Sequence, residues 1–512
     1  MNRLRNPSEI ETAARRIAAL LDARGEWFCA EGRGAERPSA LRRGEWEVSA
    51  QRGALLLSYW GAGGARVWRV RGWEWRGGKL LLEATRRAGA VRATLELVPR
   101  ASAAADAAEL AAARRAECER LAALLCESVG PGARIEEARL SAGARRGEPG
   151  RYARILLRRG RETHAATGPI VELGSEEAGA FVASALLWFA QLGSRRAGAP
   201  RGLLLFGPRK LSAAAAELVS LLRAELRGAL EVYELGGGRK TFERVREPDL
   251  EELLDASPRL SGPARADLTE TAARIRGLAP EAIDVVRARH GETLRFRGLA
   301  FARVRRLPGG ERAWFGVEGV RQRRSLDASS WPDLPRLVGE LEEHRRAGGS
   351  AGRHALYRAA PEAWLESLLR RDVTRLDPGL VVSPVHAQFR TTRGQRARGG
   401  PIDLLALRRD GRLVVIELKV SEDAALPLQG AQYWRRISTH HRAGHITRAR
   451  LFGNAEISDD PPLVYLVAPL LRFHRSFQTL ARAVTPEIEM YRFDLNEDWR
   501  AGVRVARRAR IG

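Results

Sequence analysis

The chain has 512 residues, a hydrophobic fraction of 44% and a formal net charge of +25 at pH 7, so it is too long for a single core and is expected to form a folded α/β protein of three or four domains. The longest apolar run, Ala180 to Leu192, is too short to span a bilayer, and the start of the chain lacks the apolar core of a signal sequence, which excludes a membrane protein. Three widely spaced cysteines form no metal-binding pattern, so we expect a cytoplasmic location with buried thiols at Cys29, Cys118 and Cys126.

The positive charge is compatible with a polyanionic partner, because arginines bind phosphate and steer association. The abundance of Arg, Ala and Gly is explained equally well by a biased base composition of the genome. Charge alone therefore leaves a nucleic-acid partner open.

Residues 1–130 are predicted to form an N-terminal helix, an antiparallel β-rich domain and a connector helix. Helical periodicity covers residues 8–24, about five strand-like runs separated by glycines lie between residues 44 and 98, and an Ala-rich helix covers residues 101–130. This pattern is typical of a β-meander flanked by helices.

One strand of this domain carries a basic and aromatic stripe. Strict alternation from Arg66 to Trp75 puts four side chains on one face, namely Arg69, Arg71, Trp73 and Trp75. Such a stripe can stack bases and neutralise phosphates. The alternative is that the tryptophans cover the core of a small sheet and the arginines form its solvated rim.

Residues 150–240 are predicted to form an α/β unit. Its elements are expected at 153–157 (strand), 170–173 (strand), 178–192 (helix), 202–206 (strand), 212–226 (helix) and 230–235 (strand). The order strand, Pro, helix, strand after residue 202 is repeated after residue 463. The unit is either a degenerate copy of the last domain or an unrelated α/β unit with the same pattern.

Residues 241–346 are predicted to contain a helical segment and a β-hairpin. The helical segment covers 249–290 with breaks at prolines, the hairpin pairs 294–305 with 312–317, and a helix covers 334–345. The Gly-rich stretch 347–352 is typical of a linker, so the last domain is expected at 353–512.

The last domain contains the most informative hairpin of the chain. Two short apolar runs, 402–407 and 413–418, flank a polar loop that contains Asp410-Gly411. If residues 409–411 form a three-residue loop with a left-handed glycine, Asp403 lies opposite Glu417, with Cβ atoms roughly 4.5–5.5 Å apart. Two facing carboxylates repel each other unless a cation lies between them.

Lys419 lies two residues beyond Glu417 and therefore on the same face of the strand. Only four of the 87 basic residues are lysines, at positions 79, 210, 240 and 419. A compact ammonium beside two carboxylates differs chemically from a guanidinium, since it can hold a water molecule or change its protonation.

Asp403 followed by Glu417-Leu418-Lys419 resembles the acid and E-x-K motifs of the PD-(D/E)xK nuclease superfamily. Gln429 and Tyr433 match its Q-x-x-x-Y element, and Glu366 resembles the helix-borne acid of its first motif. The order and spacing are most similar to the C-terminal domain of the NucS/EndoMS-type mismatch endonucleases, over roughly residues 360–435. The rest of the chain has no evident match to them.

The resemblance implies a restriction-endonuclease-like α/β/α domain. If residues 150–240 are a degenerate copy of it, they are expected to have a nuclease-like fold as well. It also implies Mg²⁺ or Mn²⁺ held by Asp403 and Glu417, hydrolysis of DNA phosphodiester bonds by an endonuclease of repair or defence, and a homodimer. Lys419 would orient or deprotonate the attacking water. The competing class is a non-catalytic nucleic-acid-binding or adaptor protein that keeps the fold.

Several of these residues have alternative interpretations. Glu366 is either a third acid of the site or the partner of Arg370 in a surface ion pair one turn along a helix. Gln429 and Tyr433 bind substrate phosphate or position Lys419, or else they cap a helix and fill a core. The expected backbone-gripping arginines of the Gly-rich loop, which an ordinary basic loop would equally explain, are Arg390, Arg393, Arg396 and Arg398. His440, His441 and His445 are expected at a solvated helix end.

Overall fold

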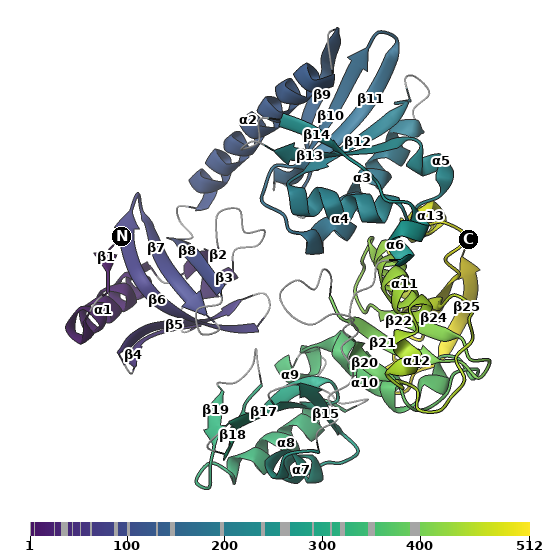
Figure 1. Cartoon of the computed structure of the whole chain (residues 1–512). Helices are drawn as coiled ribbons and strands as arrows, with labels where there is room; N and C mark the ends of the chain where they lie inside the picture. Colours follow the sequence, from purple (N-terminus) through teal and green to yellow (C-terminus); the bar gives the residue numbers. More distant parts are fainter. Residues whose placement is uncertain are drawn as a thin grey trace. The chain divides into compact units, whose positions relative to one another are not determined.

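The structure is a computed structural model (Figure 1). It describes residues 2–4, 6–24, 26–31, 39–42, 45–51, 53–61, 64–86, 91–99, 103–129, 132–143, 149–194, 199–236, 241–255, 267–288, 291–307, 310–317, 323–346, 354–389 and 400–511. Within these ranges no helix is long and apolar enough to cross a membrane. The chain divides into two compact units, the smaller of which comprises Met1–Ala116, Ala142–Gly150 and Gly316–Arg323. The larger comprises Glu117–Ser141, Arg151–Phe315 and Arg324–Gly512.

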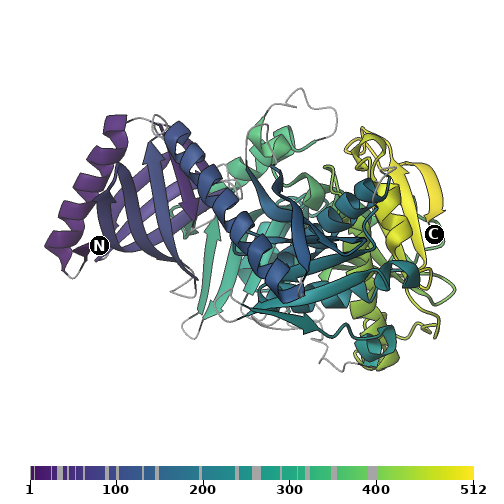
Figure 2. The same ribbon diagram turned by 90° about the horizontal axis from the view of Figure 1, so that it is seen from above.

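The smaller unit is an antiparallel sheet with helix α1 (Pro7–Arg24) along one face, as Figure 2 shows. The strand order is β3-β2-β8-β7-β6-β5-β4, with β1 paired to β6. Asn6 caps α1 by accepting from the Glu9 amide at 2.9 Å, and Ile17 and Leu21 pack into the sheet core. The predicted helix and antiparallel meander are confirmed. The strands are β1 (Asn2–Arg3), β2 (Glu26–Glu31), β3 (Ser39–Arg42), β4 (Trp46–Gln51), β5 (Ala54–Gly61), β6 (Gly64–Arg76), β7 (Lys79–Arg86) and β8 (Val91–Pro99).

The first sheet of the larger unit has the order β14-β13-β12-β11-β10-β9. Its strands are β9 (Ala133–Ala142), β10 (Pro149–Arg159), β11 (Glu162–Pro169), β12 (Gly202–Gly207), β13 (Leu230–Gly236) and β14 (Thr241–Val245). Its helices are α2 (Ala103–Val129), α3 (Ala178–Gly193), α4 (Arg209–Val219) and α5 (Ala224–Arg227). The prediction of a strand at 170–173 is wrong. The preceding and less apolar segment, β11, pairs with β10 instead. Ile170 and Val171 lie in the loop after β11, where their side chains fill the core.

The second sheet of the larger unit has the order β15-β16-β17-β18-β19. Its elements are β15 (Ile283–Ala288), β16 (Gly291–Phe296), β17 (Leu299–Leu307), β18 (Gly310–Phe315), β19 (Arg324–Leu326), α7 (Glu270–Gly277) and α8 (Asp333–His344). The preceding helix α6 (Leu250–Asp255) instead places its leucines in the core that contains the first sheet. The prediction of a helical segment that continues to residue 290 is wrong beyond residue 277, where α7 ends. Residues 283–288 pair with β16 as a strand, so tertiary pairing decides their conformation. A tight turn at Arg297-Gly298 also divides the expected single strand 294–305.

The third sheet of the larger unit carries helices on both faces. The order is β20-β21-β22-β23-β24-β25, in which β22, β23 and β24 are parallel and the outer pairs are antiparallel. One face packs on Trp364, Leu365 and Leu369 of α10, and the other packs on Tyr433 and Ile437 of α11. The elements are α9 (Ala355–Arg358), α10 (Pro361–Arg371), β20 (His386–Phe389), β21 (Ile402–Leu407), β22 (Leu413–Leu418), α11 (Leu426–Arg442), α12 (His445–Arg448), β23 (Leu463–Pro469), α13 (Phe477–Ala483), β24 (Met490–Leu495) and β25 (Val505–Ile511).

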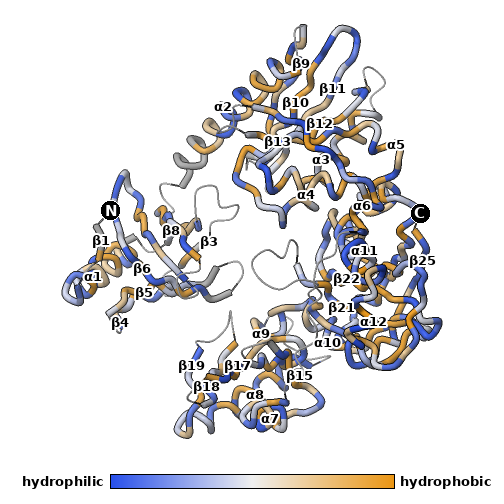
Figure 3. Tube along the Cα trace, in the orientation of Figure 1, coloured by the Kyte–Doolittle hydropathy of each residue, from blue (hydrophilic) through white to orange (hydrophobic). Residues whose placement is uncertain are grey.

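The sheets β9–β14 and β20–β25 share one topology. In both, an antiparallel pair (β10-β11, β21-β22) leads through a helix into two parallel strands and ends on an antiparallel edge strand. The central strands β12 and β22 are hydrophobic along most of their length, as buried central strands require (Figure 3). The repeated strand, Pro, helix, strand pattern therefore corresponds to a repeated sheet topology.

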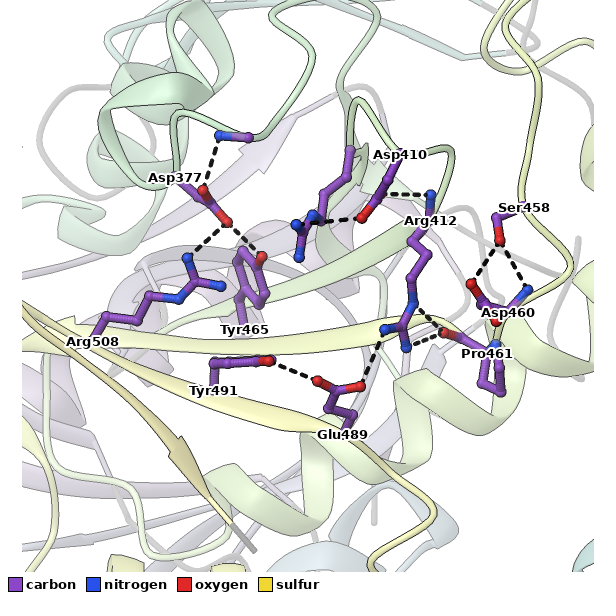
Figure 4. Close-up of polar contacts among 12 residues, drawn as sticks. Asp377, Asp410, Arg412, Ser458, Asp460, Pro461, Tyr465, Glu489, Tyr491 and Arg508 are labelled. Carbon is purple, nitrogen blue, oxygen red and sulfur yellow. Dashed lines mark hydrogen bonds and ion pairs between the residues drawn. The ribbon is translucent and has the colours of Figure 1, made fainter.

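Polar contacts hold the loop between β21 and β22 (Figure 4). In the ladder of paired residues, this loop lies at the opposite end from Asp403 and Glu417. Asp410 accepts from the Arg412 amide at 3.1 Å, and the Arg412 guanidinium contacts the Pro461 carbonyl at 2.8 Å and Glu489 at 3.1 Å. Tyr491 donates to the same Glu489 at 2.6 Å. These contacts tie the hairpin to the parallel strands and fix its register.

We expect Gly411→Ala to destabilise the chain by about 2–4 kcal/mol, because Gly411 is left-handed (φ 83°) and an added Cβ would lie 2.9 Å from the Ser458 amide nitrogen. Gly453→Ala is the matched control, since Gly453 is also left-handed (φ 66°) but has open space around it. Chemical denaturation of the two variants measures the difference. Equal losses of stability would show that the close contact at Gly411 contributes nothing.

Candidate active site

The two strands that carry the candidate acids pair in the predicted register. Leu404 pairs with Ile416 and Leu407 with Leu413, so the next pair along the ladder is Asp403 and Glu417. The Arg408 amide donates to the Arg412 carbonyl at 2.8 Å, which closes a three-residue loop around the left-handed Gly411. The predicted loop and register are confirmed.

Glu417 is the most deeply buried acid of this site, with 1% of its surface exposed. One carboxylate oxygen, Oε1, accepts from Lys419 Nζ at 2.7 Å, and the other, Oε2, has no hydrogen-bond partner among the described residues. Burial, followed by the nearby Asp403, raises the pKa of Glu417 well above its ordinary value, against the opposing effect of Lys419. An ionised Glu417 therefore needs more positive charge than Lys419 supplies.

Asp403 sits between the strand ends and a neighbouring glutamine. Its Oδ2 accepts from the Leu418 amide at 2.9 Å, and its Oδ1 accepts from Gln388 Nε2 at 3.3 Å. Burial raises the pKa of Asp403, although these hydrogen bonds and Lys419 act in the opposite direction. The charge of Asp403 also raises the pKa of Glu417, so the two carboxyl groups behave as one coupled pair.

Lys419 remains a cation in this environment. Burial is the largest single effect and disfavours its charge, but Glu417, Glu362 and Asp403 together outweigh burial and raise the pKa of Lys419 above its ordinary value. A lysine with a raised pKa is a poor proton acceptor near neutral pH. Of the two roles expected for Lys419, this environment favours orienting a water molecule and stabilising negative charge over removing a proton.

Glu366 lies on α10 and is 5% exposed, with Oε2 accepting from Gln388 Nε2 at 2.6 Å. Burial raises the pKa of Glu366 to about 7, although Arg295, whose guanidinium lies 3.8 Å away, lowers it. Arg370 forms its ion pair with Asp284 at 3.5 Å. The alternative of a surface ion pair between Glu366 and Arg370 is therefore wrong, and Glu366 joins the cluster around Asp403.

Arg295 reaches this cluster because the sheet β15–β19 is docked against α10. Gly298, at the turn after β16, has a positive φ of 82° and lies so close to Ala363 that a Cβ would fall 1.9 Å from the Ala363 carbonyl oxygen. Asp284 of β15 accepts from Ser367 at 2.7 Å, and the fully buried Arg345 donates to the Arg297 and Leu356 carbonyls, both at 2.8 Å. These contacts fix Arg295 beside Glu366.

Two further residues of the site, Gln388 and Glu362, were not predicted from the sequence. Gln388 is aligned with Asp403 across the β20–β21 pair and has a positive φ of 50°, and its amide bridges Glu366 and Asp403. Glu362 lies one turn before Glu366 and accepts from the Val420 amide at 3.5 Å. Gln388 belongs to no recognisable motif, but the spacing of Glu362 and Glu366 on one helix face could have indicated the second acid.

Gln429 and Tyr433 face each other on α11, and Gln429 Nε2 donates to Tyr433 Oη at 3.0 Å. Tyr433 is 4% exposed and packs in the core between α11 and the sheet. Burial, and then the charge of Glu417, raise the pKa of Tyr433 to about 12. The core role expected as an alternative is therefore present, and the hydroxyl also lies close enough to Glu417 to respond to its charge.

The basic and aromatic stripe of β6 is divided by a β-bulge. The register of β6 and β7 shifts between Val70 and Gly72, so Trp73 and Trp75 pair with the buried Leu82 and Leu80. Both tryptophans pack against the sheet core. Arg69 and Arg71 are exposed, and Arg69 pairs with Thr85 on the opposite face. The four side chains do not form the single stripe that strict alternation predicts, because the extra residue of a bulge reverses the alternation.

Two other groups of residues were predicted from the sequence. Arg390, Arg393, Arg396 and Arg398 fall outside the described residues. The expectation of a solvated histidine cluster is wrong for His440, which is 1% exposed and lies 3.0 Å from His445 between their Nδ1 atoms. Burial lowers the pKa of His440 to about 4, so His440 is neutral at pH 7.

The acids of the site suit a hard divalent cation. Asp403 and Glu417 offer carboxylate oxygens on adjacent strands, and one Glu417 oxygen is buried with no hydrogen-bond partner in the described part of the chain. Mg²⁺ is commonly held by one or two carboxylates together with water and substrate phosphate. Over the ranges that the structure describes, no group of three or more His, Cys, Asp or Glu residues is arranged as a metal site. In comparisons with known proteins, no family model matches the chain and no curated protein matches it.

Proposed function

We propose that residues 353–512 form a metal-dependent deoxyribonuclease domain of the PD-(D/E)xK kind, which hydrolyses phosphodiester bonds as an endonuclease of DNA repair or defence. One observation carries the proposal. The coupled acids, half-buried Asp403 and buried Glu417, have raised pKa values beside a protonated Lys419, and one oxygen of Glu417 has no hydrogen-bond partner among the described residues. A fold has no structural reason to keep such a pair unless its charge is used.

Each residue has a role that follows from its contacts. Asp403 and Glu417 would hold Mg²⁺ or Mn²⁺, which when bound supplies positive charge to the scissile phosphate and to the attacking water. Lys419, which contacts Glu417 at 2.7 Å, would orient that water and offset negative charge that develops at the phosphate. Gln388 fixes the carboxyl groups of Asp403 and Glu366 in relation to each other.

Glu366 would accept a proton from the water. The pKa of Glu366 is about 7, so near neutral pH the carboxyl group is partly ionised and can take up a proton. The Gln388 amide links Glu366 to Asp403 by donating a hydrogen bond to each. Lys419 is less suited to this role because its pKa is raised. The proton acceptor and the cation of the site are therefore different residues.

Incubation of the purified chain with supercoiled plasmid, single-stranded DNA and mismatched duplex, each with Mg²⁺, Mn²⁺ or EDTA, tests the proposal. We expect cutting that requires Mg²⁺ or Mn²⁺ and is abolished by EDTA. Binding of DNA without cutting of any substrate would instead support the competing class, a non-catalytic nucleic-acid-binding or adaptor protein.

We expect Arg295→Gln to move the acid limb of the pH–rate profile to higher pH. Loss of the cation 3.8 Å from Glu366 raises the pKa of that acid, so less of it is ionised at neutral pH. Cleavage should fall by about tenfold near pH 7 and recover at higher pH. Arg303→Gln, at an exposed position of the same sheet, is the control. A uniform loss of rate at every pH would contradict a role for Glu366 as proton acceptor.

A further inference from the structure

The unit β9–β14 lacks Asp403, Glu417 and Lys419 of the proposed centre at the equivalent positions. Thr167 pairs with Leu205, three residues before Pro208, just as Glu417 pairs with Leu466, three residues before Pro469. Thr167 is therefore the counterpart of Glu417. Its cross-strand partner is Arg154, which is the counterpart of Asp403, and two residues further along the strand Pro169 is the counterpart of Lys419.

The replacements are built into the core of that unit. Thr167 is 3% exposed and donates to the Ala153 carbonyl at 2.7 Å, and Arg154 lies over the Trp188 ring at 5.4 Å. Residues 179 and 183 follow Pro169 at the spacing at which Gln429 and Tyr433 follow Lys419, and they are Gly and Ala. A carboxylate pair cannot form here, so this copy holds no second centre of the same kind.

Within the larger unit, the part that contains β9–β14 and the part that contains β20–β25 pack on each other through equivalent segments. The chain after α4 and the chain after α13 form an antiparallel bridge at Leu222 and Val484. The Arg223 amide donates to the Ala483 carbonyl and the Thr485 amide donates to the Leu221 carbonyl, both at 2.9 Å. Leu218 and Leu222 share one hydrophobic core with Leu480 and Val484. In a two-fold symmetric dimer interface, each subunit likewise contributes the same segment to the contact.

We infer that residues 150–245 act as an internal, inactive partner of the nuclease domain, so that the chain is a pseudo-dimer with one competent centre that cuts one strand of duplex DNA per binding event. The inference rests on the proposed function. A homodimer of active domains can place one centre on each strand, but here the segment after α13 is already paired with its counterpart within the chain. The substrate class is duplex DNA and the product is a nick.

Cleavage of supercoiled plasmid by excess full-length chain under single-turnover conditions tests this outcome. We expect open-circular DNA to accumulate completely before linear DNA forms, and the chain in solution to have the mass of a monomer. Linear DNA formed at the same rate as open-circular DNA would overturn the inference while supporting a nuclease. Absence of both products with Mg²⁺ and with Mn²⁺ would mean that the proposed function itself has failed.

A disulfide across the bridge tests the pairing of the two units. Leu222 and Val484 are flanked by the two hydrogen bonds, so they form the close type of antiparallel pair, with Cα atoms about 4.5 Å apart, which suits a disulfide. We expect Leu222→Cys/Val484→Cys to form an intrachain disulfide on oxidation, to remain monomeric and to keep nicking. Leu222→Cys alone is the control. Failure to cross-link, formation of disulfide-linked dimers, or loss of nicking on oxidation would overturn the inference.

Discussion

Lys419→Ala is expected to slow DNA cleavage by at least about 10²–10³-fold while the chain stays folded. Lys419 is the residue that neutralises Glu417, at 2.7 Å, and its raised pKa keeps it positively charged throughout the neutral range. Removing it leaves two coupled, buried acids without a permanent cation and removes the charge that would face the phosphate. Single-turnover rates on plasmid, measured with saturating Mg²⁺, give the size of the loss.

Matched variants separate this role from a general loss of basic charge. Lys210→Ala removes another of the four lysines at an exposed position on α4 and should leave the rate unchanged. Lys419→Arg should remain impaired, because a guanidinium is larger and flat and cannot repeat the contact of an ammonium inside the site. Asp403→Ala should abolish cleavage as well. If Lys419→Ala cut DNA at the rate of the unmodified chain, Lys419 would have no part in the reaction.

The hairpin of the site could be predicted because all of its determinants are local. Two short apolar runs, an Asp-Gly loop and the two-residue spacing of Glu417 and Lys419 predict the register within seventeen residues, and the observed pairs agree with it. The helix that carries Glu366 and the helix that carries Gln429 and Tyr433 were expected from the resemblance to the nuclease motifs, and both segments are helical.

The remaining residues of the site depend on contacts between distant segments. Arg295 reaches Glu366 only because the sheet β15–β19 docks on α10 through Gly298 and Arg345, and no local pattern encodes that docking. Gln388 is defined by a left-handed backbone at a position that reads as an ordinary strand. The bulge in β6 was missed because one extra residue leaves no mark in the sequence but reverses the face of Trp73.

Glu417→Gln is expected to stabilise the metal-free chain at alkaline pH and to abolish its response to Mg²⁺. The pKa of Glu417 is raised in the folded chain by burial and by Asp403, so the folded state holds a proton that the unfolded state releases above about pH 4.5. The free energy of unfolding therefore falls as the pH rises from there through the folded pKa. A neutral glutamine of the same size does not ionise, and it can still accept from Lys419.

Calorimetry or thermal denaturation at several pH values, in EDTA and in excess Mg²⁺, measures this effect. In EDTA at alkaline pH we expect the variant to be about 1–3 kcal/mol more stable than the unmodified chain, the usual cost of an unsatisfied buried polar group, with the difference vanishing toward acid pH. Mg²⁺ should stabilise the unmodified chain, by about 2.7 kcal/mol at a hundredfold excess over the dissociation constant, and should leave the variant unchanged. Glu456→Gln, at an exposed position, should behave as the unmodified chain in both buffers. A variant that is less stable in EDTA at every pH would mean that the Glu417 carboxylate stabilises the fold and that the site has no need of a metal ion.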